Sequence, residues 1–322
     1  MNSETHNRIN FSVVIPLYNK ERHIQRAIRS VLNQTHQAFE LIIIDDGSTD
    51  NSFEMAASIQ DPRIHIFRKQ NRGLPATRNR GVRESANEWI AFLDADDEWL
   101  PGFLETVNEL QHEFPQSGCL STSYYRAKEN QMLDSPTDRM PYSLNWSGII
   151  DDVFNAFRIY HPFFPSSIAI RKDAILAAGG FPEGVDYGED TITWMKLGVT
   201  TTIAYKNTPL SIYHLDADNR MCLELDARLK DINRITYLKR DLEEGRIPPK
   251  FIPSAQEYLC KHQISLAKRE VAVGDNVKAL SLLWESRKTR CYKKKLVVTT
   301  IRALIPYKIK VLRRKVLSWM KR

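Results

Sequence analysis

The first hundred residues alternate between short apolar runs and segments in which apolar side chains recur with a helical period. An apolar run at 11–17 predicts a strand, and apolar residues in 24–32 fall at the i, i+3, i+4, i+7 and i+8 positions of one helix face. The same pattern predicts strands at 41–44, 63–67 and 89–93 and helices at 52–59, 73–86 and 101–113. The order β-α-β-α-β-α-β is typical of an α/β fold with a mostly parallel sheet flanked by helices on both faces.

The second half of the chain is less regular. Residues 117–164 show no sustained period and predict a mixture of strands and loops, whereas short helices are predicted at 173–178 and 191–197. Beyond about residue 222 the chain becomes helical and polar. We therefore expect four parts, namely a flexible N-terminus at 1–10, an α/β domain at 11–221, a helical extension at 222–286 and a basic amphipathic tail at 287–322.

Composition narrows the class of protein. Of the 322 residues, 42% are apolar and 26% are charged, as in soluble globular proteins. No run approaches the ~18 consecutive apolar residues that span a bilayer, and the polar N-terminus lacks the apolar stretch of a secretory signal. The cysteines are widely spaced without a C-x-x-C pair. This spacing favours reduced thiols in a cytoplasmic protein over a disulfide framework or a zinc site.

Charge is distributed unevenly along the chain. The 46 Lys and Arg against 39 Asp and Glu give a net charge of +7, but residues 287–322 hold 14 basic and no acidic side chains, so the remainder carries −7. In 308–319 basic and apolar residues mix at helical spacing, which indicates a helix on an anionic membrane surface; a solvated basic tail is the alternative. Nucleic acid is not an expected partner, because the tail has few aromatic residues and the body is acidic.

Polar clusters follow three of the predicted strands. They are Tyr18-Asn19, Asp45-Asp46-Gly47 and Asp94-Ala95-Asp96. Ligands of parallel sheets bind beyond the carboxyl ends of the strands, so these clusters are expected to share one crevice. Two carboxylates at i and i+2 can bind one hard cation, with a phosphate substrate supplying other ligands. An ordinary surface turn is the alternative for each acidic cluster.

Phosphate recognition in this crevice is expected to differ from that of nucleotide-binding folds with glycine-rich loops. Asp46 could accept a hydrogen bond from a base or a ribose hydroxyl, but the segment has neither the P-loop lysine pattern nor the G-x-G-x-x-G spacing. That absence argues against a dehydrogenase. Basic side chains such as Arg78 and Arg80, which follow Gly73, and a metal ion would meet the phosphate charge instead.

Two further candidates lie downstream. Glu189 and Asp190 open the predicted helix that carries Trp194. They either oppose the helix macrodipole, or Asp190 acts as a general base if partial burial raises its pKa. His214 follows a predicted strand, and it is either a structural histidine or part of a metal or diphosphate site.

Six of these segments, taken in order, resemble family 2 glycosyltransferases. They are VVIPLYN at 13–19, IDDGSTD at 44–50, GLPATRN at 73–79, FLDADD at 92–97, GGF at 179–181 and GED at 188–190. The resemblance covers roughly residues 10–220. It implies the GT-A fold, with a Rossmann-like nucleotide half and an acceptor half, and inverting transfer of a sugar from a nucleotide sugar to an acceptor hydroxyl.

The resemblance also implies roles for single residues. It implies that the nucleotide sugar is bound by Pro16, Tyr18, Asp46, Arg78 and Asp94. Among these, Tyr18 is expected to stack on the base, Arg78 to lie near the diphosphate and Asp94 to face the ribose. It assigns a metal ion, Mg²⁺ or Mn²⁺, to Asp96, with His214 near the metal and the diphosphate. It makes Asp190 the catalytic base, with Glu189 beside it.

The resemblance suggests partners as well. We expect a nucleotide-sugar donor, with UDP as the first choice of nucleotide, and a saccharide or lipid-linked saccharide acceptor in bacterial cell-surface polysaccharide or lipopolysaccharide synthesis. The expected location is the cytoplasm, with peripheral contact at the inner membrane through 287–322.

Two departures from the family pattern refine this expectation. Trp194-Met195-Lys196 stands where many members carry an arginine, and lysine lacks the bidentate fork of arginine. The Q-x-x-R-W signature and the membrane helices of processive synthases are missing, which favours transfer of a single sugar. A nucleotidyltransferase and a non-catalytic nucleotide- or carbohydrate-binding module remain the alternatives.

Overall fold

The computed structural model describes residues 9–129, 131–135, 138, 140–185, 187–217 and 227–305. The chain divides into two compact units, Met1–Glu224 and Leu225–Arg322. The part of the expected amphipathic tail at 308–319 lies outside the described residues. Within the described part of the chain, no helix combines the length and the apolar character needed to cross a bilayer.

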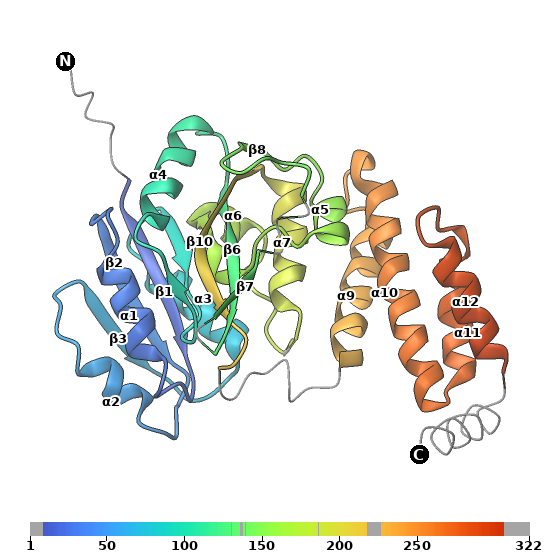
Figure 1. The fold of residues 1–322 in the computed structure, drawn as a ribbon, viewed down its shortest axis with the longest axis horizontal. Helices are drawn as coiled ribbons and strands as arrows, with labels where there is room; N and C mark the ends of the chain where they lie inside the picture. Colours follow the sequence, from blue (N-terminus) through green and yellow to red (C-terminus); the bar gives the residue numbers. More distant parts are fainter. Residues whose placement is uncertain are drawn as a thin grey trace. The chain divides into compact units, whose positions relative to one another are not determined.

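The first unit begins with the predicted alternation of strands and helices (Figure 1). Its elements are β1 (Phe11–Leu17), α1 (Ile24–Leu32), β2 (Phe39–Asp45), α2 (Ser52–Ala57), β3 (Ile64–Arg68), α3 (Leu74–Glu84) and β4 (Trp89–Phe92). Strand β1 pairs in parallel with both β2 and β4, and β2 pairs in parallel with β3. The predicted parallel sheet is therefore confirmed, and the carboxyl ends of these four strands lie at one edge of it.

The rest of the unit extends the same sheet mainly with antiparallel pairs, whereas β10 pairs in parallel with β6. The added strands are β5 (Glu98–Trp99), β6 (Cys119–Lys128), β7 (Gln131–Asp134), β8 (Ser147–Ile149), β9 (Ile168–Arg171) and β10 (Ile203–His214). The main order is β3-β2-β1-β4-β9-β6-β10-β5, so β9 lies antiparallel between β4 and β6. This arrangement joins the strands near the chain start to those that end near residue 214.

Helices cover both faces of the sheet. The added helices are α4 (Phe103–Glu113), α5 (Val153–Ile159), the 3-10 turn η2 (Pro165–Ser167), α6 (Lys172–Ala177) and α7 (Glu189–Thr200). Helix α5 lies in a segment for which only strands and loops were expected. Its start is stabilised by the Asp152 carboxylate, which accepts a hydrogen bond from the Asn155 backbone N–H at 3.0 Å.

The core follows from side chains that alternate across the sheet. Val13 and Ile15 of β1 pack with α1 on one face, and both are fully buried. Val14 lies on the opposite face, against Gly81 of α3. A strand that is buried on both faces has no polar side to expose, which explains the nearly continuous apolar runs of β1 and β2.

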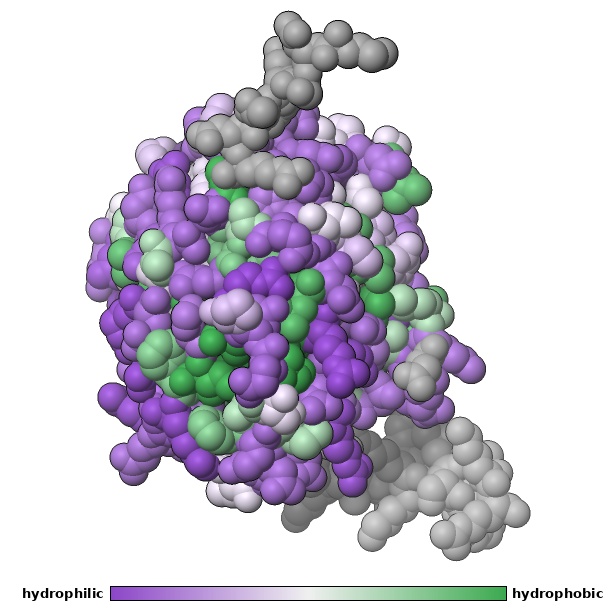
Figure 2. Space-filling model, turned by 90° about the vertical axis from the view of Figure 1, so that its left-hand side faces the viewer, coloured by the Kyte–Doolittle hydropathy of each residue, from purple (hydrophilic) through white to green (hydrophobic). Residues whose placement is uncertain are grey.

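The β3 edge ends the sheet on one side. Figure 2 views the molecule from that side and shows hydrophobic residues gathered among hydrophilic ones. Ile64 and Ile66 of β3 are half-buried here. The Arg63 guanidinium lies 4.4 Å from the centre of the Phe39 ring and that of Arg80 lies 5.5 Å from the Phe67 ring. Charged side chains at an edge strand oppose pairing with another chain.

The second unit is helical. It contains α9 (Ala227–Glu243), η3 (Pro249–Phe251), α10 (Ile252–Val273), α11 (Asn276–Glu285), η4 (Ser286–Lys288) and α12 (Lys293–Leu304). Gly274, at φ 97°, ends α10, and the Asp275 carboxylate caps α11 by accepting the Lys278 N–H at 3.0 Å. Apolar residues of α9 to α12 form one core, so α12 belongs to this unit although it begins the segment expected as a tail.

Gly81→Ala is expected to lower the free energy of unfolding by about 1–3 kcal/mol through overpacking. A β-carbon at Gly81 would lie 2.2 Å from Cγ1 of Val14, so α3 would have to move away from β1. In an open helix the same substitution stabilises by about 1 kcal/mol. Urea unfolding measures the change.

The Val14→Ala variant is the control protein in which the effect of Gly81→Ala is measured a second time. It removes the clashing methyl groups, so Gly81→Ala should destabilise Val14→Ala much less than it destabilises the unmodified protein. Equal effects of Gly81→Ala in the two backgrounds would contradict the close approach of α3 to β1.

Candidate functional site

The three polar clusters predicted to share a crevice lie together beyond the carboxyl ends of β1, β2 and β4. The first two are joined directly, because the Asn19 backbone N–H donates to the Ser48 hydroxyl at 3.1 Å and the Asn19 side-chain oxygen accepts the Thr49 N–H at 2.9 Å. Asn19 has a positive φ of 50°, which asparagine tolerates better than most residues. The turn after β1 is therefore fixed against the turn after β2.

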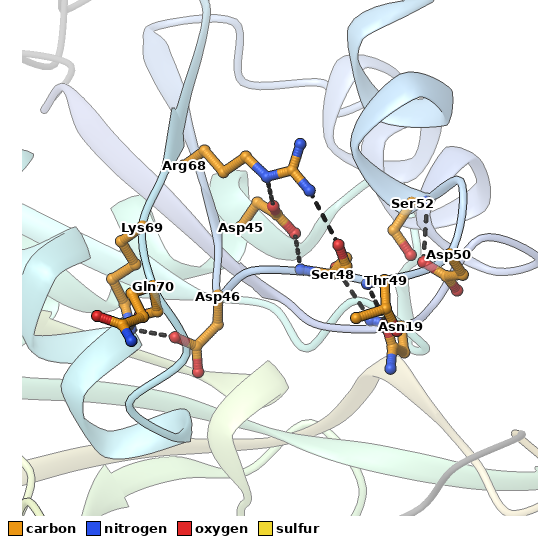
Figure 3. Close-up of polar contacts among 10 residues, drawn as sticks. All are labelled: Asn19, Asp45, Asp46, Ser48, Thr49, Asp50, Ser52, Arg68, Lys69 and Gln70. Atoms are coloured by element: carbon orange, nitrogen blue, oxygen red, sulfur yellow. Dashed lines mark hydrogen bonds and ion pairs between the residues drawn. The ribbon is translucent and has the colours of Figure 1, made fainter.

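Asp45 ends β2 and Asp46 follows it, and the two carboxylates point to different partners (Figure 3). The fully buried Asp45 carboxylate contacts the Arg68 guanidinium at 3.0 Å and accepts the Ser48 N–H at 3.2 Å. Asp45 thus holds the turn to β3.

Asp46 organises the loop that leads into α3. Its carboxylate pairs with the Lys69 ammonium and accepts the backbone N–H groups of Arg72 and Gly73, each at 2.9 Å. Only 3% of Asp46 is exposed. The expected contact of Asp46 with a nucleotide stays a prediction, whereas the structure shows this carboxylate fixing the residue that precedes α3.

Pro16 and Tyr18 differ in their exposure. Pro16 is buried within β1, where it pairs with Ile44 of β2. Tyr18 follows the strand and is 44% exposed, although large aromatic side chains are usually well buried. The Tyr18 ring is therefore accessible to a ligand at the strand end.

Each acidic residue of the turn after β4 contacts a different part of the unit. The Asp94 carboxylate accepts a hydrogen bond from the Arg78 guanidinium at 2.7 Å, and the Asp96 carboxylate lies 2.9 Å from the Lys20 ammonium. Asp97 is fully buried and accepts the Ser166 hydroxyl at 2.6 Å and the His214 backbone N–H at 3.2 Å. The turn is thus connected to the loop after β1, to α3, to η2 and to β10.

Arg78 joins the acidic turn to α7. Its guanidinium is 1% exposed and lies between two carboxylates, with Nη2 at 2.7 Å from Asp94 and Nη1 at 2.8 Å from Glu189. The Phe181 ring centre lies 5.3 Å from the guanidinium carbon. These contacts make Arg78 a positioning residue for two acids. A contact with a diphosphate stays a prediction, and Arg80 is elsewhere, paired with Glu84 at 3.2 Å.

Glu189 and Asp190 begin α7. Gly188 precedes them at φ 86°, in the left-handed region that glycine adopts readily, and Asp190 accepts the Thr191 backbone N–H at 2.6 Å. Glu189 is buried, whereas Asp190 is half-buried. Asp190 therefore lies nearer to the surface than the glutamate beside it.

Burial and mutual repulsion perturb the acids of this cluster. Burial, followed by the charge of Asp190, raises the pKa of Glu189 to about 7 against the opposing effect of Arg78. Burial raises the pKa of Asp94 as well, and the charges of Asp96 and Asp190 add to that shift. Because these acids influence one another's ionisation, the residues expected at the metal and at the catalytic base share one region.

Burial and repulsion act on Asp97 in the same way. Burial, together with the charges of Asp96 and Asp94, raises the pKa of Asp97 well above its ordinary value. Its hydrogen bonds to Ser166 and His214 oppose this shift.

His214 ends β10 beside the acidic turn. Its Nε2 lies 2.9 Å from the Glu98 carboxylate, and only 6% of the residue is exposed. This hydrogen bond lowers the pKa of Glu98. His214 is therefore near the expected metal position, held by Glu98.

Sequence reasoning did not select Lys20, Asp97, Ser166 or Glu98. Lys20 had a local signal, since it is a basic residue directly after the Tyr18-Asn19 turn, and Asp97 belongs to the acidic run that starts at Asp94. Ser166 gave no signal, because its contact with Asp97 spans 69 residues of chain.

Comparisons with known proteins identify the family of the chain. A model of the family described as glycosyl transferase family 2 matches residues 12–175, just over half of the chain. The chain therefore belongs to glycosyl transferase family 2. The match ends before Glu189 and Asp190, so it covers the acidic turn after β4 but not the start of α7.

Relatives with similar sequences are described as glycosyltransferases. A Rickettsia conorii protein, "Uncharacterized glycosyltransferase RC0461", is 27% identical over 324 residues, which covers 98% of this chain and 52% of that protein. A Rickettsia bellii "Uncharacterized glycosyltransferase" is 32% identical over 212 residues, which covers 65% of this chain and 29% of that protein. The chain thus spans about half or less of the length of these two relatives.

Solved structures confirm the predicted GT-A fold. The crystal structure of Staphylococcus aureus TarS 1–349 in complex with UDP-GlcNAc has a TM-score of 0.60 and 16% sequence identity, covering 91% of this chain and 89% of that one. The complex of the same TarS segment with UDP has a TM-score of 0.56. Both likenesses concern the fold.

Glu189→Gln is expected to remove an ionisation near pH 7 from the pH dependence of kcat/KM, because the pKa of Glu189 is raised to about 7. Below this pH Glu189 is protonated and its negative charge no longer acts on Asp190, the residue expected to be the catalytic base, so turnover is expected to fall. Hydrolysis of a nucleotide sugar measured against pH is the test. Glu183→Gln, at an exposed glutamate, is the control and should keep the wild-type profile.

Stability offers a second readout of the same ionisation that needs no substrate. Since the folded-state pKa of Glu189 is raised from 4.5 to about 7, the folded state holds this proton more tightly than the unfolded state does. The free energy of unfolding of the wild type relative to Glu189→Gln should therefore fall as pH rises from 4.5 to 7. A pH-independent difference would contradict the raised pKa.

Proposed function

We propose that the protein is an inverting glycosyltransferase that moves one sugar from a nucleotide sugar to an acceptor hydroxyl. The observation that carries this proposal is the Arg78 guanidinium, which holds Asp94 of the strand-end turn and Glu189 of α7 at 2.7 and 2.8 Å. It brings Asp96 and Asp190, their sequence neighbours, to one edge of the sheet. Family membership supports the reaction class, and the UDP-GlcNAc and UDP complexes of TarS support a UDP-sugar donor.

In this reaction Asp190, Glu189 and Arg78 would each have a different role. Asp190, half-buried at the start of α7, takes the proton of the acceptor hydroxyl as its oxygen attacks the anomeric carbon. The nucleoside diphosphate leaves from the opposite side, so the configuration inverts in one step. Glu189, when ionised, places a second negative charge beside Asp190, and Arg78 fixes the Glu189 carboxylate.

The donor nucleotide is proposed to bind beyond the ends of β1 and β2. Tyr18 offers an exposed ring on which a base can stack, and buried Pro16 shapes the strand beneath it. Asp46 holds the loop of Arg72 and Gly73 at the same end of the sheet by accepting their backbone N–H groups. Asp94 is proposed to face the ribose.

A divalent cation, Mg²⁺ or Mn²⁺, fits the residues at the acidic turn. Among the described residues no group of three or more His, Cys, Asp or Glu side chains could hold a metal ion by itself. A magnesium site that uses one or two carboxylates and the phosphates of a substrate does not need such a group. Asp96 would supply the carboxylate, exchanging its contact with Lys20, and the cation would stabilise charge on the leaving diphosphate.

His214 is less readily available as a ligand of this metal, because its Nε2 already contacts Glu98. It would become a ligand only if its Nε2 exchanged the Glu98 carboxylate for the cation. We therefore assign the metal to Asp96 first and His214 second.

The acceptor is proposed to be a saccharide or a lipid-linked saccharide of bacterial cell-surface polysaccharide or lipopolysaccharide synthesis. Such an acceptor would be reached in the cytoplasm, at the inner membrane. The proposal rests on the resemblance of the motifs and on the cationic C-terminal segment.

Asp190→Asn is expected to lower turnover by about 10²–10⁴-fold while leaving the affinity for the donor within about two-fold. The amide keeps the shape of the side chain and loses the basic oxygen. Release of nucleoside diphosphate from a nucleotide sugar, with binding followed by calorimetry, is the measurement. Normal turnover of this variant would refute the role of Asp190, and release of pyrophosphate by the wild type would indicate a nucleotidyltransferase.

Asp96→Ala is expected to weaken Mn²⁺-dependent binding of UDP at least about ten-fold. Lys20 then loses a carboxylate partner, so a weak metal-independent binding of the diphosphate should remain. Calorimetric titration of UDP with Mn²⁺ or with a chelator measures both contributions. Asp173→Asn, at an exposed aspartate of α6, is the control. Wild-type affinity that does not respond to the chelator would rule out the metal assignment.

A further inference from the structure

Helix α12 presents its more apolar stripe to solvent. Leu296, Thr299 and Ala303 face the other helices of the second unit, where Thr299 and Ala303 are buried. The opposite face carries Val297, Ile301 and Leu304, which are 56%, 56% and 66% exposed. These three residues lie at i, i+4 and i+7, so they form one continuous stripe. The helix thus buries threonine and alanine while it exposes larger aliphatic side chains.

Lys293 and Lys294 border this stripe, and two further cations of α12 lie farther round the helix. Lys293, Lys294 and Lys295 occupy the first turn of α12 and Arg302 its last turn, and all four are exposed. Positive charge at the start of a helix opposes the macrodipole, so three lysines there are unfavourable in water. An anionic surface would neutralise the lysines and the positive helix end together.

The charge of the surrounding segment has one sign. Residues 287–305 contain seven Lys and Arg and no Asp or Glu. A second copy of the chain is a poor partner for α12, because pairing two such stripes would bring the lysines of both helices together. A partner for α12 must therefore be apolar at the stripe and negative around it.

We infer that α12 docks on the surface of a membrane that contains anionic lipids. Val297, Ile301 and Leu304 enter the boundary between headgroups and acyl chains, and Lys293–Lys295 bind lipid phosphates. The helix lies in the plane of the interface, consistent with the finding that no described helix could cross the bilayer. The inference rests on this surface and is independent of the transfer reaction proposed above.

The full chain is tested by flotation with vesicles of phosphatidylcholine, with or without phosphatidylglycerol. The wild type should float with the anionic vesicles, and added salt should reduce the bound fraction. Replacing Lys293, Lys294 and Lys295 by Gln should weaken binding about five-fold for each lysine, or about a hundred-fold in all. Val297→Glu with Ile301→Glu should abolish flotation, and the milder Val297→Ala with Ile301→Ala should reduce it.

Leu176→Glu with Met132→Glu is the matched control, because these residues of the first unit are 55% and 52% exposed. This control should float like the wild type, and circular dichroism should show every variant folded. Equal flotation of the wild type and the lysine variant would overturn the inference. So would equal binding to neutral vesicles, or a change of oligomeric state in the Val297 and Ile301 variants without a change in flotation.

Discussion

The candidate site depends on one buried guanidinium. Asp94, Asp96, Glu189 and Asp190 place four carboxyl groups at one edge of the sheet, where repulsion and burial oppose their ionisation. Arg78 lies between two of them and is itself 1% exposed. A buried arginine that binds two carboxylates compensates much of this charge, whereas removing one partner would leave a buried charge without compensation.

The position of Arg78 is set by contacts at both ends of α3. Asp46 binds the backbone of Arg72 and Gly73, directly before α3, and Gly81 lets α3 approach Val14 of β1 closely. Arg78 lies between these points, so the loop that is expected to bind the nucleotide also fixes the residue that orients Glu189. The residues proposed to bind the donor and those proposed to act in catalysis are therefore connected through one helix, α3.

The two units differ in the surface they present. In the first unit, acids cluster where parallel strands end, and lysine and arginine side chains contact them individually. In the second unit, α12 exposes aliphatic residues and lysines with no acidic residue among them. An enzyme acting on an acceptor at a membrane would use both surfaces, the first for chemistry and the second for attachment.

The local pattern of residues was sufficient to predict the strands and helices up to β4 and the acidic residues that follow the strands. Both the period of apolar residues and the residues typical of turns can be recognised within a few positions of the chain. Helix α5 was not predicted, since it is only seven residues long and its segment has no sustained period. The partners of the acids were decided by the tertiary structure. Arg78 meets Glu189 across 111 residues, and Asp97 meets the His214 backbone across 117. Such pairs form only when β9 and β10 join the sheet beside β4 and β6. The sequence identifies the side chains that can carry a charge. Burial and distance in the tertiary structure determine which of these side chains contact one another.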